Sequence, residues 1–389
     1  LEQADKAPWK PDNRIVVNFA KYIVDTMNGF FIGVPIKTFS NDDKVNEYLQ
    51  FLDKYNDQDD NNVELSKITS IYGKGYEFYY VDSNGEIAIT YMSPLEGFMI
   101  YDDTVACNPL YFVHYFVDSQ NVLRGSCFDG TYECPFVQEN GLKFLDERLH
   151  GFDGIPVTEY IENEERMSLF EGVYSMMNAY NKALSDKAND VDYFGDAYLK
   201  ILGAQLDEVA LQNIRDNRVI NFTGDAKLEA EFLSKPNGDT SQENLINRLE
   251  RLIFQTAMIP NINDENFGTA SGIALKYRIN LAKNKERKFT SGMNQRFRKI
   301  FSNPVNSMNA NDWLSIEYVF TQNIPSNLLE EAQIASQLSG VVSQETQLKQ
   351  LSIVDDVQKE LERLSSNLDP IGFTQDYSLL RTGVSDGEE

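Results

Sequence analysis

Three pairs of adjacent carboxylates are the side chains in this sequence whose types and spacing could support catalysis. Asp102-Asp103, Glu164-Glu165 and Asp355-Asp356 could act as general acids and bases or hold a magnesium ion. The chain has 60 Asp and Glu residues, however, so adjacent pairs arise by chance at this density. None of the three lies beside a glycine-rich turn or a histidine, and we interpret them as solvent-exposed surface charge.

Two further segments begin like ligand-binding loops but lack the residues that the chemistry needs. Residues 57–61 read Asp-x-Asp-x-Asn, as a calcium loop does, but Asn62 replaces the turn glycine and Ile68 stands where a bidentate Glu is required. We therefore expect residues 57–62 to form a solvent-exposed loop. Residues 73–75 (Gly-Lys-Gly) continue into neither a dinucleotide fingerprint nor a P-loop.

The cysteines and histidines are few and poorly spaced for a metal site. Cys107, Cys127 and Cys134 form no Cys-x-x-Cys, and we expect them to be the reduced thiols of an intracellular protein. With only His114 and His150, most zinc sites and histidine-assisted nucleophiles lack their ligands. His114 lies in an apolar run that predicts a buried strand, so we expect it to be packed. We predict no catalytic residue, no metal site and no cofactor.

The positive charge of the chain is concentrated in one predicted helix. Residues 276–299 hold nine basic side chains against one acidic side chain, Glu286, a net charge of +8. Subtracting this +8 from the net charge of −25 leaves −33 on the other 365 residues. The nine basic residues are Lys276, Arg278, Lys283, Lys285, Arg287, Lys288, Arg296, Arg298 and Lys299.

This basic segment has three interpretations. It can be a surface whose charges pair with acidic neighbours, including those of another copy of the chain. It can be an amphipathic helix on a membrane surface, although the remaining −33 opposes binding to anionic lipid. It can also contact nucleic-acid phosphates locally. A single basic helix in a strongly acidic chain favours transient contact with DNA over tight binding.

The composition is that of a globular protein, with 42% hydrophobic and 24% charged residues. A length of 389 residues is enough for two or three domains. No apolar run approaches the ~18 residues that a membrane span needs. The first residues show neither a secretory signal nor an initiating Met, and we expect the natural start to have been trimmed.

Hydrophobic spacing predicts a helical N-terminus followed by a strand-rich region. Apolar residues recur at three- and four-residue steps from Ile15 to Met27, and Gly29 is predicted to end that helix. A second helix is expected over 43–55. Strands are predicted over 76–81, 86–91, 97–101, 110–117, 122–128 and 131–137, in an antiparallel sheet with a hairpin turn at 83–85.

The second half is organised around three long predicted helices. The first spans 165–191 with one apolar stripe from Phe170 to Val191. A small mixed insertion follows, and a capping box at Thr240 and Glu243 opens a helix that stops at Pro260. A polar loop over 260–271 leads into the basic helix, where Ser291-Gly292 predicts a kink.

A strand over 313–320 and short helices over 327–338, 345–351 and 355–364 complete the chain. The tail after Pro370 is polar and acidic, and we expect it to be mobile. The predicted fold class is α+β.

Three stretches of the sequence, in this order, resemble one protein family. They are residues 13–36, which include Asn-Arg-Ile-Val-Val-Asn-Phe and Ile-Gly-Val-Pro-Ile; residues 267–277, Phe-Gly-Thr-Ala-Ser-Gly-Ile-Ala-Leu-Lys-Tyr; and residues 343–362, which include Ser-Gln-Glu-Thr-Gln-Leu and Val-Asp-Asp-Val. The chain resembles the portal proteins, or head–tail connectors, of tailed double-stranded-DNA bacteriophages. The likeness covers nearly the whole chain and is greatest to the siphophage type from phages and prophages of Gram-positive bacteria.

The resemblance implies an architecture of named parts. These are a strand-rich wing over 1–164, a stem helix over 165–194, a small α/β clip over 195–238, a second stem helix over 239–260, a tunnel loop over 261–271, a kinked tunnel helix with a return to the wing over 272–325, a short helical crown over 326–370 and a flexible acidic tail over 371–389.

The resemblance also implies a function that is structural and not enzymatic. Such proteins form a ring, a dodecamer, at a unique capsid vertex, and the ring is the conduit for double-stranded DNA during packaging and ejection. The implied partners are other copies of the chain, the terminase large subunit, the head–tail adaptor, the scaffold and the major capsid protein, with no membrane. The implied location is the virion, and the host cytoplasm during assembly.

Site residues follow from the same resemblance. The tunnel-loop residues that would face DNA are Asn261, Asn263, Asp264, Glu265, Asn266 and Thr269. The basic residues that would contact phosphates or a neighbouring subunit are Lys276, Arg278, Lys283, Lys285, Arg287 and Lys288.

A metal-dependent carboxylate enzyme on an α+β scaffold is the alternative. Particle size separates the two hypotheses, because a ring of about a dozen subunits indicates a portal, whereas a small monomer with activity that depends on divalent ions indicates the enzyme.

Overall fold

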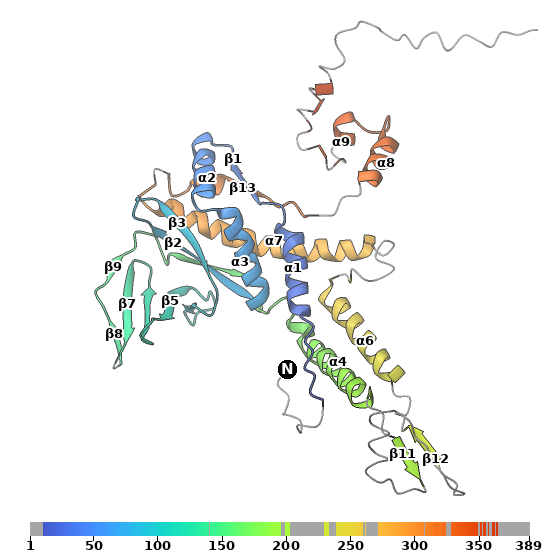
Figure 1. Cartoon of the computed structure of the whole chain (residues 1–389). Helices are drawn as coiled ribbons and strands as arrows, with labels where there is room; N and C mark the ends of the chain where they lie inside the picture. Colours follow the sequence, from blue (N-terminus) through green and yellow to red (C-terminus); the bar gives the residue numbers. More distant parts are fainter. Residues whose placement is uncertain are drawn as a thin grey trace, which may run out of the picture. The chain divides into compact units, whose positions relative to one another are not determined.

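The computed structural model describes residues 11–139, 141–195, 199–202, 229–232, 239–259, 261, 271–306, 308–323, 328–348 and isolated positions between 351 and 364. Helices and strands are both abundant, and the fold is α+β as predicted (Figure 1). The chain divides into two compact units, Leu1–Asn323 and Ile324–Glu389. None of the helices in the described ranges is long and apolar enough to cross a membrane.

The N-terminal part of the first unit begins with three helices and one short strand, and continues with a series of strands. Its elements are α1 (Phe19–Ile32), β1 (Lys37–Ser40), α2 (Asp43–Tyr55), α3 (Gln58–Tyr72), β2 (Lys74–Val81), β3 (Ile87–Met92), β4 (Gly97–Tyr101), β5 (Pro109–Val117), β6 (Leu123–Phe128), β7 (Tyr132–Gln138), β8 (Leu142–Phe144), β9 (Arg148–Leu149) and β10 (Val157–Ile161).

The remainder of the chain is mainly helical. The first unit continues with the 3₁₀ turn η1 (Glu171–Val173), α4 (Tyr174–Gly195), β11 (Leu199–Leu202), β12 (Glu229–Phe232), α6 (Asp239–Ala257), α7 (Ser271–Ser302), the 3₁₀ turn η2 (Asp312–Ser315) and β13 (Ile316–Val319). The second unit contains α8 (Leu328–Leu338) and α9 (Gln344–Leu348).

The strands form antiparallel sheets in which distant segments meet. β2 lies between β3 and β10, and the six-stranded sheet runs β4-β5-β6-β7-β8 with β9 also paired to β7. β1 pairs with β13, and β11 pairs with β12. The predicted hairpin between β2 and β3 is confirmed, with Gly85 in the left-handed region at φ 81°. β8, β9 and β10 were not predicted.

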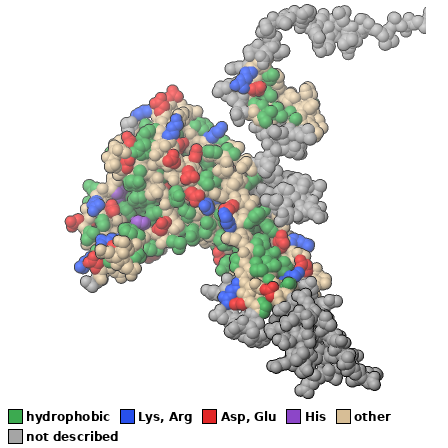
Figure 2. Space-filling view, viewed as in Figure 1, with side chains coloured by type: hydrophobic (Ala, Val, Ile, Leu, Met, Phe, Trp, Pro, Cys, Tyr) green, Lys and Arg blue, Asp and Glu red, His purple; other side chains and the backbone are tan. Residues whose placement is uncertain are grey.

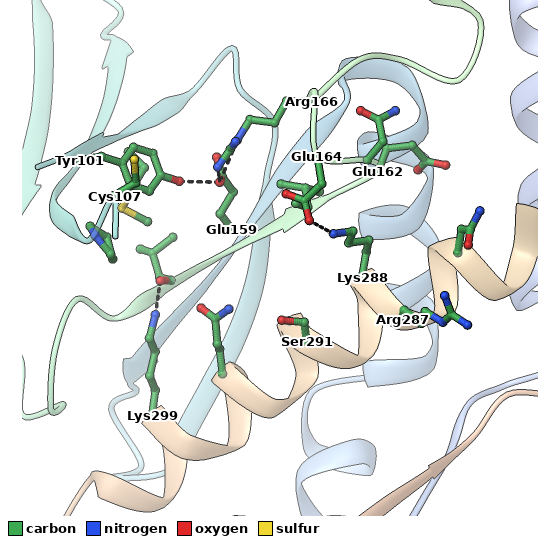
Figure 3. Close-up of a pocket in the computed structure, with 18 residues that line it drawn as sticks. Tyr101, Cys107, Glu159, Glu162, Glu164, Arg166, Arg287, Lys288, Ser291 and Lys299 are labelled. Atoms are coloured by element: carbon green, nitrogen blue, oxygen red, sulfur yellow. Dashed lines mark hydrogen bonds and ion pairs between the residues drawn. The ribbon is translucent and has the colours of Figure 1, made fainter. Parts of the chain in front are cut away.

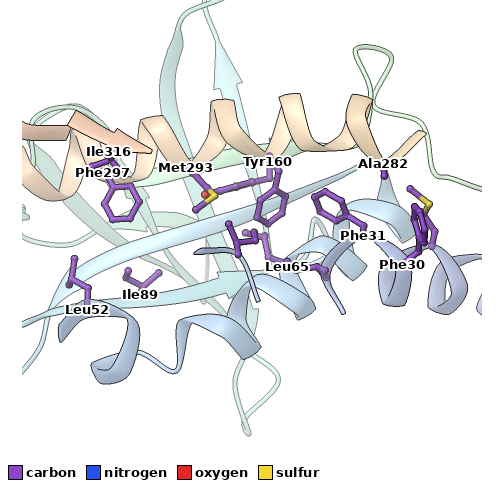
Figure 4. Packing of buried hydrophobic residues seen from close by; sticks show 14 of the residues in the cluster. Phe30, Phe31, Leu52, Leu65, Ile89, Tyr160, Ala282, Met293, Phe297 and Ile316 are labelled. Carbon is purple, nitrogen blue, oxygen red and sulfur yellow. The ribbon is translucent and has the colours of Figure 1, made fainter. Parts of the chain in front are cut away.

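The main core lies between α7 and the layer formed by α1, α3 and β10 (Figure 4). The Phe289 ring lies 4.9 Å from that of Tyr160 and 5.7 Å from that of Phe31, measured between ring centroids. Gly292 allows this approach, because a Cβ at that position would lie 2.3 Å from the Tyr160 ring. α7 runs as one helix from Ser271 to Ser302, and Gly292 serves close packing within it. The kink expected at Ser291-Gly292 stays a prediction.

A smaller core joins the two larger sheets. Tyr76 of β2 packs edge-on against Phe112 of β5, with ring centroids 5.0 Å apart, and Phe128 and Val157 complete the cluster. Residues 110–117 form a strand as predicted, within β5, but the prediction that this strand is buried and His114 packed is wrong. Phe112 is buried, but Phe116 is 49% exposed and His114 is half-buried.

Helix α1 differs at both ends from its prediction. It begins at Phe19, where the Asn18 side chain accepts a hydrogen bond from the Lys21 backbone N–H, and it continues through Gly29 to Ile32. Gly33 follows it, and a Cβ at that position would lie 2.2 Å from the Gly29 carbonyl oxygen. The expected stop at Gly29 is therefore wrong.

The predicted loop over 57–62 is also wrong, because α3 begins there. Asp57 adopts a left-handed conformation at φ 47°, and Gln58 starts the helix. Gln58 and Asn62 are 2% and 4% exposed, since their amides bind groups on other elements. The neighbouring α2 has the predicted bounds.

α4 and α6 lie side by side as an antiparallel pair, and the antiparallel strands β11 and β12 form part of the insertion between them (Figure 1). α4 begins at Tyr174, later than predicted, and its apolar stripe ends early. Along its second half the buried positions are Asn181, Ser185 and Asn189, whereas Val191 is 63% exposed. The predicted stripe is therefore wrong for this half.

The second unit is a short helical pair. The Gln347 side chain donates a hydrogen bond of 2.7 Å to the Ala335 carbonyl oxygen, which ties α9 to α8. The chain turns after α8 at Ser339-Gly340, where Gly340 adopts a left-handed conformation at φ 79°. Most of the helix expected over 355–364, and the whole tail, lie outside the described residues.

Candidate functional site

The tunnel-loop residues of the sequence prediction are described at one position. Asn261 follows α6, and its side-chain amide donates a hydrogen bond of 2.9 Å to Glu250 Oε1. Asn263, Asp264, Glu265, Asn266 and Thr269 lie outside the described residues. Lys276 and Arg278 belong to α7, but their side chains also lie outside the described part.

The described part of α7 separates its cations onto two faces. Lys285 and Arg296 lie on the buried face with Ala282, Phe289 and Met293. They are eleven residues apart, which is close to three turns of an α-helix. Lys283, Arg287 and Arg298 lie on the exposed surface.

Lys285 is tied to three groups within its own chain. Its Nζ lies 2.7 Å from Glu162 Oε2, 2.5 Å from Ser70 Oγ and 3.0 Å from the Ser66 carbonyl oxygen. Its side chain is 3% exposed and that of Glu162 is 6% exposed. Lys285 therefore anchors α7 to α3 and to the end of β10. This is a correction for Lys285, because its burial leaves no surface for a phosphate or a neighbouring subunit to contact in this structure.

Arg296 forms the second buried anchor. Its guanidinium binds both oxygens of Glu77 on β2, at 2.8 Å from Nε and 2.7 Å from Nη2. Nη2 also donates to Asn62 Oδ1 at 2.7 Å. Burial acts to lower the pKa of Arg296, but the Glu77 carboxylate outweighs it and holds the pKa above its ordinary value. Arg296 is therefore charged at any working pH.

Glu77 gathers further polar groups around the same pair. Its Oε2 accepts hydrogen bonds from the Tyr79 hydroxyl at 2.8 Å and the Tyr160 hydroxyl at 3.0 Å. Gln58 donates to Oε1 at 3.3 Å. Because a buried charge is costly unless it is paired and hydrogen-bonded, these contacts explain why two ionised side chains are tolerated in the core.

A groove of about 650 Å³ runs along the other polar side of α7 (Figure 3). The helix lines it with a stripe at three- and four-residue steps, as expected for one face of a helix. The opposite wall comes from β10, the segment after it, β4 and the loop before β5. The residues that α7 contributes are Asn284, Arg287, Lys288, Ser291, Gly292, Gln295 and Lys299.

The walls of the groove carry both signs of charge. Lys288 forms an ion pair with Glu164, whose side chain is 75% exposed. Across the groove, Arg166 donates to Glu159 Oε2 at 2.8 Å, and the Tyr101 hydroxyl donates to the same oxygen. Lys299 donates to the Val157 carbonyl oxygen. Burial lowers the pKa of Lys299 to about 8, although Glu77 acts in the opposite direction.

Arg287 is the groove cation without a bound partner in the described structure. No ion pair or hydrogen bond joins it to another described residue, and Figure 3 shows it extending from α7 without contact to a labelled carboxylate. On the face that Figure 2 shows, Lys and Arg side chains are scattered among the other surface side chains and do not form one continuous basic patch.

The carboxylate pairs and thiols do not assemble into a reactive site among the described residues. Asp102 accepts hydrogen bonds from Thr104 and Asn108, which lower its pKa and close a turn. The described part of the chain contains no cluster of three or more His, Cys, Asp or Glu side chains able to hold a metal. Cys127 and Cys134 lie opposite one another on β6 and β7 as free thiols.

Sequence reasoning treated all the cations of α7 as one group and missed the two buried pairs. The spacing of the residues contains this information, because Lys285 lies three residues after Ala282 and Arg296 lies three residues after Met293. Those steps place both cations on the predicted apolar face of the helix. Their partners, Glu77 and Glu162, could not be identified, since each is more than 100 residues away.

Comparison with known proteins assigns the chain to a family. The family model described as "Phage portal protein, SPP1 Gp6-like" matches residues 1–369. The chain is 22% identical over 396 residues to the portal protein of Clostridium phage phiCD119, covering 94% of this chain and 87% of the relative. It is 20% identical over 416 residues to the portal protein of Bacillus phage SPP1, covering 98% of this chain and 81% of the relative.

Proposed function

The chain belongs to the SPP1 Gp6-like family of phage portal proteins, and from this premise we propose that it forms a ring at one vertex of a phage capsid and conducts double-stranded DNA during packaging and ejection. The match over residues 1–369 is the observation that carries the proposal, since it includes every part that such a ring would use. We further propose a ring of twelve subunits.

The proposed parts keep their sequence bounds. The wing over 1–164 would contact the scaffold and the major capsid protein. The clip over 195–238 would bind the terminase large subunit during packaging and the head–tail adaptor afterwards. The tunnel loop over 261–271 would face DNA, supported by α7, and residues 326–370 would form the crown.

Charge on the α4–α6 pair supports a conduit that does not hold its cargo. α4 contains three acidic and two basic residues, and so does α6. DNA carries about one negative charge per 1.7 Å of helix axis, so a basic wall would bind it with a strong dependence on salt. A nearly neutral or acidic wall of stem helices would let the duplex slide.

The size of the particle tests the ring. The full chain should sediment and appear in negative-stain micrographs as rings of about twelve copies, above a threshold concentration. A protein that stays monomeric over the micromolar range, with or without scaffold protein, contradicts the proposal. A monomer with activity that depends on divalent ions would favour the metal-enzyme alternative.

DNA packaging tests the conduit separately from the ring. Asp186→Lys together with Asp192→Lys on α4 should slow packaging and make it more sensitive to low salt, because lysines along the wall would bind phosphates. Asp186→Asn together with Asp192→Asn is the matched control, since it removes the acids without adding cations. If rings of the lysine variant package DNA at the wild-type rate, α4 does not line the path of the duplex.

A further inference from the structure

We propose that the groove along α7 receives a carboxylate side chain from a second copy of the chain, and that Arg287 binds it. This inference rests on the proposed ring and specifies one of its subunit contacts. It assigns the partner of the groove by chemistry, as an acidic segment of the neighbouring subunit.

The charges on α7 single out Arg287. Among the cations whose side chains are described, Lys285, Lys288 and Arg296 each bind a carboxylate of their own chain, and Lys299 binds a backbone carbonyl. Lys283, Arg287 and Arg298 are exposed and make no ion pair or hydrogen bond with described residues. Of these three, Arg287 lines the groove.

The size of the groove and the charge of its walls favour a side chain over a DNA duplex as the bound group. A volume of about 650 Å³ accommodates a few side chains. It is too small for a DNA duplex, whose major groove alone is about 12 Å wide. Glu162 and Glu164 lie in the wall, so a continuous run of phosphates would meet nearby negative charge. A single carboxylate can reach Arg287 and form the bidentate pair that a guanidinium favours.

The groove also offers neutral hydrogen-bonding groups beside Arg287. Asn284, Ser291 and Gln295 are exposed and project from the same stripe of α7. They could bind the backbone of an inserted segment without adding charge. Polar groups around one unpaired cation are an arrangement suited to an acidic loop or helix end.

The overall composition makes a second copy the complementary partner. The chain has 60 acidic and 35 basic residues, so every copy carries an excess of carboxylates. Closed rings use head-to-tail contacts in which different surfaces of two subunits meet. A groove in which Arg287 has no partner among the described residues, together with the excess of carboxylates on every copy, satisfies that requirement.

Charge reversal gives the first test. Arg287→Glu should raise the concentration at which rings form by at least about tenfold, measured by mass photometry in low salt, because like charges would then face one another. Lys283→Glu and Arg298→Glu are the matched controls, since both change an exposed, unpaired cation of α7 outside the groove. They should assemble as the wild type does. Equal assembly by all three variants overturns the proposal.

Cross-linking gives the second test and identifies the bound segment. Arg287→Lys keeps the charge and introduces an amine, and rings assembled from a mixture of ¹⁵N-labelled and unlabelled copies are treated with a carbodiimide. A peptide pair that joins position 287 to a carboxylate of the differently labelled copy supports the proposal. Cross-links confined to one copy, for example to Glu164, overturn it.

The outcomes separate this inference from the proposed function. If the wild-type chain forms no ring, both the proposed function and the proposed groove contact are contradicted. If the wild type forms rings and Arg287→Glu assembles equally well, the proposed portal function is retained and only the groove contact is contradicted. If Arg287→Glu assembles normally but its rings lose DNA during packaging, Arg287 contacts phosphate instead, and the subunit contact is again overturned.

Discussion

Arg296 on α7 and Glu77 on β2 form a bidentate ion pair in which each side chain is 1% exposed. Asn62 on α3 and Tyr160 on β10 bind the same pair. The neighbouring elements α3 and β2 are therefore joined at one point to the distant β10 and α7. Together with the Lys285–Glu162 pair, this contact fixes the middle and the C-terminal part of α7 to the rest of the first unit.

Breaking this pair should be strongly destabilising. Glu77→Gln leaves Arg296 buried without a counter-charge, and we expect it to lower the free energy of unfolding by about 3–5 kcal/mol. Urea unfolding, followed by circular dichroism and tryptophan fluorescence at concentrations that keep the chain monomeric, measures this. A loss below about 1 kcal/mol would contradict the buried pair.

Two variants control that experiment. Asp25→Asn removes the exposed Lys21–Asp25 pair on α1, and should change stability by less than about 1 kcal/mol. The double variant Glu77→Gln with Arg296→Met removes both charges, so it should be less destabilised than the sum of its single variants. An additive result would mean that the two side chains do not interact.

Substitution by alanine at two helical glycines should change the free energy of unfolding in opposite directions. Gly292→Ala forces a methyl group into the Tyr160 ring, and should lower the free energy of unfolding by about 1–3 kcal/mol. Gly29 lies within α1 with nothing within 4 Å of its would-be Cβ. Gly29→Ala should therefore raise stability by up to about 1 kcal/mol through helix propensity. Urea unfolding measures both variants. Changes of the same sign in the two free energies of unfolding would contradict the close packing of Gly292 against Tyr160.

The segment before α1 is held by a ladder of side chains on α4. Asn189, Ser185 and Asn181 accept hydrogen bonds from the backbone N–H groups of residues 13, 15 and 17 at 2.6, 2.9 and 2.9 Å. Four helical residues rise about 6 Å and two extended residues span about 6.6 Å, so the two repeats match.

Ser185→Ala should loosen this segment without unfolding the helix. Removing the acceptor costs about 1 kcal/mol, and amide exchange at Ile15 should accelerate roughly five-fold if opening is local. Ser175→Ala, at an exposed position of the same helix, is the control. Unchanged exchange over residues 13–17 in Ser185→Ala would mean that the ladder does not hold the segment.

The sequence predicts elements well where local signals and burial agree. Alternating strands, the hairpin at Gly85 and the bounds of α2 are all confirmed. The failures arise where distant groups decide the outcome. Residues 57–62 appear polar enough for a loop, but Gln58 and Asn62 supply hydrogen bonds to Glu77 and Arg296, so they are buried in a helix.

The same reasoning explains the errors at the candidate site. The second half of α4 buries polar residues because the segment over 13–17 supplies their hydrogen-bonding partners, which no periodicity on α4 could reveal. The spacing of α7 does identify Lys285 and Arg296 as cations on an apolar face. It cannot identify the carboxylates that neutralise them, or the groove, because the other walls come from β4, β10 and the loop before β5.

Lys299 should make stability depend on pH in the alkaline range. Its folded pKa is lowered by burial to about 8, from an ordinary value of 10.5. Between these values the unfolded chain binds more protons than the folded chain does, so this residue makes stability rise with pH across that window. Below pH 8 both states are protonated, and the full cost of charging Lys299 in the fold is present.

Comparison with Lys299→Met isolates this contribution. The wild type should gain stability relative to the variant between pH 8 and pH 10, in urea unfolding at half-unit steps, and the difference should be flat below pH 7.5. Buried tyrosines such as Tyr79 and Tyr160 have raised pKa values and act in the opposite direction above pH 10. Both proteins share that effect, so it cancels in the difference. Lys283→Met, at an exposed position, is the control, and its free energy of unfolding should change with pH as that of the wild type does. The same behaviour in Lys299→Met would show that Lys299 titrates as an ordinary lysine.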